Sequence, residues 1–156
     1  MLETSNSEQL ESRQLAKRFF KQTWTYLEKP DRTPDDDLMM IHLAHASRLH
    51  WQIAGDARNW SIGEWQISRV YAVLGRAEPA FIHGRACLRI ATENRLRPFQ
   101  LGFAHEAIAR ALAISDPESA REHIATATAF AQDVEDPEDK KNLESDLATI
   151  RLVGPS

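Results

Sequence analysis

The stretch from Glu64 to Glu93 decides the fold, and it reads EWQISRVYAVLGRAEPAFIHGRACLRIATE. Its apolar residues recur every three or four positions on both sides of Gly75, which is the pattern of two amphipathic helices joined by a turn. A shift of 40 residues superposes this stretch on the chain that follows, pairing Tyr71 with Ala111, Gly75 with Ser115, Ala80 with Ala120 and Cys87 with Ala127. Closely packed helices need small side chains where their backbones approach. The self-match therefore predicts a repeated helix-turn-helix unit.

Helix starts of one type recur along the chain. Thr33-Pro34, Asp116-Pro117 and Asp136-Pro137 each place a capping side chain before a proline, and acidic residues follow. Ser61 and Glu64 fit a capping box. These signals predict helices over residues 6–29, 34–54, 60–74, 77–94, 98–114, 117–134 and 137–151. Because no segment has the pattern of a strand, the predicted fold class is all-α, with about seven antiparallel helices.

The stretch quoted above resembles the tetratricopeptide repeat family. The matching residues are the large-then-small pair Ile67-Ser68, the tyrosine Tyr71, Gly75 at the turn, and the small residues Ala80 and Cys87, with Ser115, Ala120 and Ala127 in a second match. Glu64 and Gly84 stand where that family has aromatic residues, and the resemblance covers about half of the chain. It implies a superhelical stack whose first helices line a concave face that holds other proteins. The last predicted helix, with Lys140, Lys141, Glu144 and Asp146, would be a polar C-terminal cap.

Composition favours one soluble domain over residues 1–156. The chain is 42% hydrophobic and 27% charged, near the averages for globular proteins, and it has no apolar run of the about 20 residues that a membrane span needs. We therefore expect no membrane partner. The single cysteine and the absence of a secretory signal favour a cytoplasmic protein. A net charge of -4 argues against nucleic acid as a partner, although an arginine-rich middle leaves a regulatory domain that touches nucleic acid as a third hypothesis.

Six histidines raise the question of a metal site. His42 and His45 share one side of a predicted helix, but the His-Glu-x-x-His arrangement of zinc enzymes is missing. His42 lies among Leu38, Leu49 and Ile53, so we expect it to be a structural histidine in the core. The alternative is a small metal-dependent helical-bundle enzyme, similar to DinB-type metalloproteins, that would use histidines from separate helices. Its candidate ligands on further helices are His83, His105 and His123.

No other pattern indicates catalysis. Cys87 occupies a small-residue packing position, where we expect inert burial. The chain contains no glycine-rich phosphate loop. We therefore expect no catalytic residue, no metal ligand, no cofactor and no enzymatic activity.

The predicted binding surface is a concave groove centred on Trp65, Arg69 and His105. Trp65 and Arg69 stand four residues apart on the first helix of a repeat, and His105 has the matching place in the next repeat. Tryptophan and arginine often dominate binding energy at interfaces, while burial of Trp65 in the core is the competing expectation. The leading hypothesis is a non-catalytic interaction or scaffold module. Its partner would be a peptide, acidic in particular, a helix of another protein, or a second copy of the chain as a homo-oligomer.

Overall fold

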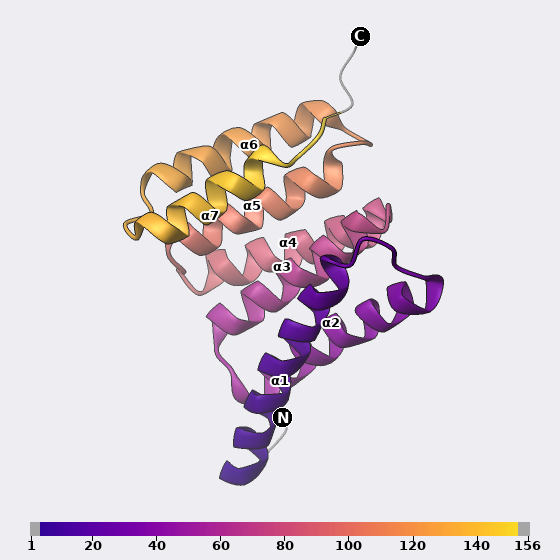
Figure 1. The fold of residues 1–156 in the computed structure, drawn as a ribbon. Coiled ribbons are helices and arrows are strands. Elements are labelled where there is room, and N and C mark those ends of the chain that lie inside the picture. Colours follow the sequence, from indigo (N-terminus) through magenta and orange to yellow (C-terminus); the bar gives the residue numbers. More distant parts are fainter. Residues whose placement is uncertain (1–3, 153–156) are drawn as a thin grey trace.

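The computed structural model describes residues 4–152, which form helices joined by short turns (Figure 1). The helices are α1 (Asn6–Leu27), α2 (Pro34–Ala54), α3 (Ala57–Val73), α4 (Ala77–Glu93), α5 (Pro98–Leu112), α6 (Pro117–Gln132) and α7 (Pro137–Ala148). No strand occurs in the described part of the chain, and consecutive helices pack against each other. The predicted all-α stack is confirmed.

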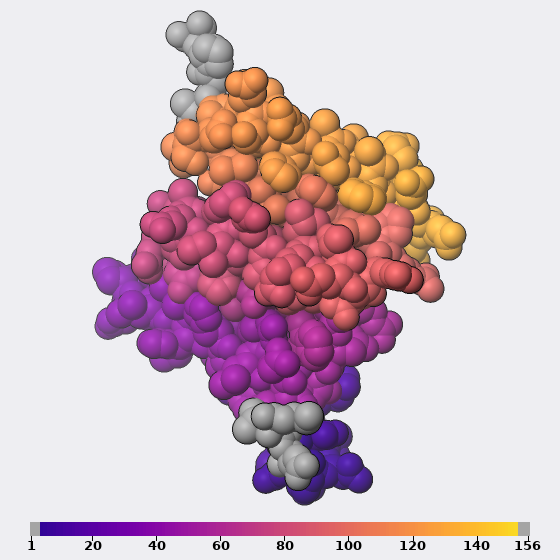
Figure 2. All heavy atoms as spheres, turned by 180° about the vertical axis from the view of Figure 1, so that it is seen from behind, coloured from indigo at the N-terminus to yellow at the C-terminus, as the bar shows by residue number. Residues whose placement is uncertain are grey.

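The helices form two layers. Each even-numbered helix packs along the odd-numbered helix before it, giving the pairs α1–α2, α3–α4 and α5–α6. The backbones of the odd-numbered helices also approach one another closely in the order α1, α3, α5, α7. In the described residues the backbones of α2, α4 and α6 do not, although the rings of His45 on α2 and His83 on α4 are 5.4 Å apart. The helix pairs are stacked in the order of the sequence. Figure 2, a view from behind, shows this as colours that follow one another in bands from one end of the molecule to the other. We call α1, α3, α5 and α7 the inner layer.

The internal repeat is present in the structure. A shift of 40 residues carries α3 onto α5 and α4 onto α6 within a residue or two. Gly75 and Ser115 occupy the two equivalent turns, and Gly75 has a φ of 74°, in the left-handed region that favours glycine. The small residues at the superposed positions are all buried: Ala80, Cys87, Ala120 and Ala127. Close helix packing is therefore the physical basis of the self-match.

One predicted helix start is wrong and the other three are confirmed. Thr33, Asp116 and Asp136 cap α2, α6 and α7 with their side chains. In contrast, α3 begins at Ala57, because Asp56 accepts a hydrogen bond from the backbone N–H of Arg58 before the chain reaches Ser61. Ser61 is then an internal residue of α3, buried against α4.

The prediction that His42 lies in the core is also wrong. His42 is exposed, and so are Leu38 and Leu49, which are 56% and 58% accessible. The opposite side of α2 is the buried one, through Met40, Ala44, Ser47 and Trp51. Because α2 has apolar residues on both sides, its periodicity could not decide which side faces the core.

Candidate interaction surface

The inner layer presents a continuous row of side chains. On α3, Arg58, Ile62, Trp65, Arg69 and Val73 follow one another at three- or four-residue spacing, so they share one side of the helix. On α5, the matching row is Phe99, Phe103, Glu106 and Arg110. The two rows meet directly, since the rings of Trp65 and Phe103 are 5.4 Å apart. We call the surface formed by these two rows the inner face.

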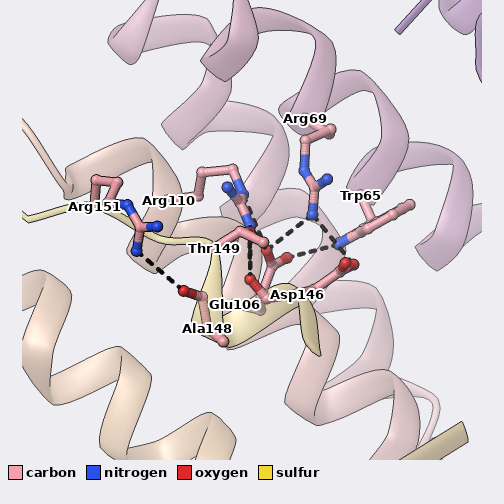
Figure 3. Close-up of polar contacts among 8 residues, drawn as sticks. All are labelled: Trp65, Arg69, Glu106, Arg110, Asp146, Ala148, Thr149 and Arg151. Atoms are coloured by element: carbon pink, nitrogen blue, oxygen red, sulfur yellow. Dashed lines mark hydrogen bonds and ion pairs between the residues drawn. The ribbon is translucent and has the colours of Figure 1, made fainter. Parts of the chain in front are cut away.

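A buried carboxylate organises the centre of the inner face. Glu106 is fully buried, and three side chains point toward it in Figure 3. Its Oε2 atom accepts a hydrogen bond from the indole N–H of Trp65 at 2.9 Å. Its Oε1 atom accepts from Arg69 at 3.0 Å and from Arg110 at 2.7 and 3.0 Å. A buried charge is tolerated when it is paired and hydrogen-bonded, and Glu106 meets both conditions.

Helix α7 joins the same cluster through the two arginines that bind Glu106. Asp146 of α7 accepts from Arg69 at 3.2 Å, while Arg110 donates to the backbone oxygen of Asp146 at 2.9 Å and to the hydroxyl of Thr149 at 2.8 Å. Burial raises the pKa of Asp146, and the neighbouring Arg69 offsets part of that rise. The interactions around Glu106 therefore join α3, α5 and α7.

Two of the predicted site residues lie together on the inner face, but they contact the fold itself. Trp65 is 6% accessible, which confirms the expectation of core burial. The guanidinium of Arg69 lies 5.1 Å from the ring centroid of Trp65 and 6.0 Å from that of Trp24 on α1. Aromatic contact, ion pairing and hydrogen bonding thus hold both side chains in place. Their role in binding a partner stays a prediction.

His105, the third predicted site residue, lies on a different side of α5. Its Nδ1 atom is 2.9 Å from Nδ1 of His123 on α6, and its ring stacks on Phe130. Burial, followed by the nearby His123, lowers the pKa of His105 to about 4. The structure therefore separates His105 from Trp65 and Arg69. The position 40 residues after Trp65 lies on the side of α5 that packs against α6.

The inner face opens into a pocket of about 250 Å³ near the first turns of α3 and α5. The rings of Trp65, Phe99 and Phe103 line it together with Ile62. Its other lining residues are Arg58, Asn59, Ser61, Cys87 and Gln100. Sequence reasoning did not find this pocket, since its walls come from α3 and α5, about 40 residues apart in sequence, with Cys87 of α4. It also missed Glu106, although an acid beside His105, between alanines and an isoleucine from Ala104 to Ala109, was a usable signal.

A second polar cluster lies between α2, α3 and α4. His45 Nε2 is 2.8 Å from the hydroxyl of Tyr71, and His83 Nδ1 is 2.7 Å from Glu64, which also accepts from Arg48 at 3.1 Å. Burial and the nearby His83 lower the pKa of His45. Within residues 4–152, no three His, Cys, Asp or Glu side chains are grouped in a way that could hold a metal ion.

Cys87 lies in the interior, as its position in the repeat predicted. It is 1% accessible, and its Sγ atom is 3.4 Å from the hydroxyl of Ser61. Burial raises the pKa of the Cys87 thiol to about 12, so the thiol stays protonated near neutral pH.

Comparison with known proteins leaves the family open. The chain matches no protein-family model, and neither the curated proteins nor the solved structures contain a significant relative. No family is assigned. Among the described residues, no helix has the length and apolar character needed to cross a membrane. The inner face and its pocket are therefore the candidate functional features of the chain.

Proposed function

We propose that the chain is a non-catalytic interaction module, similar to tetratricopeptide repeats, that binds a peptide or a helix of another protein on its inner face. The observation that carries this proposal is the pocket of about 250 Å³, which opens between the first turns of two inner helices and has three aromatic walls. Concave apolar sites with a few polar groups at the edge are typical binding sites. We further infer a reducing compartment such as the cytoplasm, because the single cysteine, Cys87, is a packing residue.

In this proposal Trp65 and Arg69 form and rigidify the binding surface before a partner arrives. The indole of Trp65 forms one wall of the pocket, and Glu106 fixes its orientation through the hydrogen bond to the indole N–H. Arg69 covers the rings of Trp65 and Trp24 and is itself fixed by Glu106. A wall that is rigid before binding reduces the entropy lost on association. An apolar side chain of the partner would enter the pocket, and the exposed Arg58 at its edge suits an acidic neighbour in the partner.

Affinity capture with a pocket variant tests this function. Ile62 is 38% accessible at the pocket, so Ile62→Lys should leave the fold intact and place a charge at the binding site. The matched control is Ile114→Lys, since Ile114 is 72% accessible in the turn between α5 and α6. We expect proteins captured by the wild type and by Ile114→Lys to be lost with Ile62→Lys. An unchanged set of captured proteins with Ile62→Lys would refute binding at this pocket.

Self-association is the second candidate, and the exposed side of α2 favours it. Leu38 and Leu49 are more than half accessible, and they lie on the same side of α2 with the exposed His42 between them. A second α2 packed antiparallel on this side would place Leu38 of each chain against Leu49 of the other. This side of α2 is therefore complementary to itself. Symmetric homodimers use such self-complementary surfaces.

Mass measurement tests the second candidate. Leu49→Lys should convert a dimer into a monomer in native mass spectrometry or light scattering, because it places a charge in an apolar contact. Ile114→Lys, which changes an exposed isoleucine elsewhere, should leave the mass unchanged. If the wild type is a monomer at tens of micromolar, or if the dimer survives Leu49→Lys, α2 is not the interface.

A further inference from the structure

The geometry of the pocket points to a small-molecule ligand. We propose that the pocket between α3 and α5 binds an apolar carboxylate, a molecule with a hydrophobic body about two fused rings in size and a carboxylate at the pocket's mouth. This inference goes beyond partner binding and does not depend on it, because the ligand would occupy the pocket of the isolated chain.

The size and walls of the pocket define the body of the ligand. An enclosed apolar cavity of about 150 Å³ holds benzene, so a pocket of about 250 Å³ has room for a larger, bicyclic group. Trp65, Phe99 and Phe103 supply aromatic walls. The indole N–H of Trp65 already donates to Glu106, and the hydroxyl of Ser61 lies against Cys87, so these lining groups are engaged. An apolar body therefore fits the interior better than a polar one.

The mouth of the pocket defines the head group. Arg58 is the cationic residue of the lining, and its side chain is 70% accessible, so it can reach a ligand from the solvent side. The side-chain oxygens of Asn59 and Gln100 accept hydrogen bonds from the backbone N–H groups of Asp56 and Arg97, both at 3.1 Å. Their amide NH₂ groups are therefore the atoms available to a ligand. A cation and two amide donors at one opening select an acceptor with negative charge.

Arg58 already has an acidic partner on its own helix terminus. Asp56 forms an ion pair with Arg58 at 2.9 Å, and its side chain is 56% accessible. Exposed ion pairs of this kind contribute little stability. Arg58 can therefore turn from Asp56 toward a bound carboxylate at small cost, while the amide donors stay in place.

Calorimetric titration with three probes of one shape tests the proposal. The probes are 2-naphthoate, the neutral 2-naphthamide and the cationic 2-naphthylmethylammonium. We expect 2-naphthoate to bind about tenfold more tightly than 2-naphthamide, and the ammonium to bind most weakly. Equal affinities for the three probes, or no binding of 2-naphthoate at millimolar concentration, would overturn the assignment of an apolar carboxylate.

Variants then assign the site. Ile62→Trp should fill the pocket and abolish binding of 2-naphthoate, whereas the control Ile114→Trp should bind it like the wild type. Arg58→Gln should weaken 2-naphthoate about threefold to tenfold and leave 2-naphthamide unchanged. Thermal unfolding of each variant confirms that it is folded. Binding of 2-naphthoate that survives Ile62→Trp would place the ligand elsewhere and refute the proposal, whatever the capture experiments show for protein partners.

Discussion

Glu106 is the residue on which the interior of the inner layer depends. Its carboxylate is fully buried and accepts hydrogen bonds from Trp65, Arg69 and Arg110, which come from two helices. Removing one member of a buried ion pair leaves the other charges without compensation, which commonly costs about 3–5 kcal/mol. A domain of this size has only about 5–15 kcal/mol of stability, so this one side chain can decide whether the inner layer stays ordered.

The change Glu106→Gln should therefore lower the free energy of unfolding by about 3–5 kcal/mol, because Arg69 and Arg110 lose their shared negative charge. Chemical denaturation measures this loss. The control is Glu144→Gln on the exposed side of α7, which should change stability by less than about 0.5 kcal/mol. Equal stability of the two variants would show that the interactions of Glu106 are dispensable.

His105 should make stability depend on pH. Its pKa in the folded chain is about 4, below the ordinary value of 6.5, because burial and His123 disfavour the charged ring. The unfolded chain therefore takes up the proton first as pH falls, and stability should be full above pH 6.5 and decrease from pH 6.5 toward pH 4. Since the ring is partly accessible, we expect a loss of roughly 1–2 kcal/mol.

Denaturation at several pH values tests this dependence. His105→Gln should flatten the decrease between pH 6.5 and pH 4, while Ile114→Gln, which changes an exposed residue and no ionisable group, should leave the wild-type profile unchanged. A profile for His105→Gln that matches the wild type would assign the pH dependence to other groups.

For single residues, the sequence allows burial to be predicted better than side-chain partners. Burial of Trp65 and Cys87 was within reach, because apolar period and small-residue positions in the repeat report directly on packing. The partners of Trp65 and Arg69 were not, since Glu106 and Asp146 come from helices far along the chain. His105 was misplaced relative to Trp65 because the repeat shift preserves helix positions better than the side on which a residue lies.

Among the elements, α4 and α5 show how closely two neighbouring helices can approach. A Cβ atom added at Gly84 would lie 3.3 Å from the backbone nitrogen of Ile108 and 3.2 Å from its side chain. Both contacts are tight, and a helix backbone cannot move aside as a flexible side chain can. The resemblance to tetratricopeptide repeats had marked Gly84 as a departure, and the close approach of α5 gives that departure a physical reason.

Gly84→Ala should accordingly destabilise the chain by about 1–3 kcal/mol, the usual cost of overpacking, even though alanine is the better helix former. Thermal or chemical denaturation measures the change. Arg85→Ala, an exposed change next in sequence, should stay within about 0.5 kcal/mol of the wild type. A Gly84→Ala chain more stable than the wild type would show that α5 can move away from α4.

The boundaries of the elements were largely predictable, because caps and prolines act through local hydrogen bonds. The starts of α2, α6 and α7 coincide with Thr33-Pro34, Asp116-Pro117 and Asp136-Pro137. The start of α3 did not follow from Ser61, since Asp56 caps the helix at an earlier position. The orientation of α2 was beyond local rules, because apolar residues occupy both of its sides and only contacts with α1 and α3 select one.

At the scale of the whole molecule, stacking of helix pairs gives the chain a layer of inner helices whose side chains meet across long separations in sequence. The 40-residue self-match predicted this repetition, because small residues are buried at matching positions of the successive pairs. The pocket was not predictable, since its shape depends on how far α3 and α5 separate at their first turns. Binding at the inner face is the central functional proposal.

Site-specific photo-crosslinking in the source cell tests that proposal most directly. A photo-crosslinking amino acid, p-benzoylphenylalanine, would replace Ile62 at the pocket in one protein and Ile114 in the turn between α5 and α6 in a second. If partners bind at the inner face, irradiation should link a defined protein to position 62 and not to position 114. Crosslinks at position 114 alone, or no crosslink at position 62 in a folded protein, would contradict binding at the inner face.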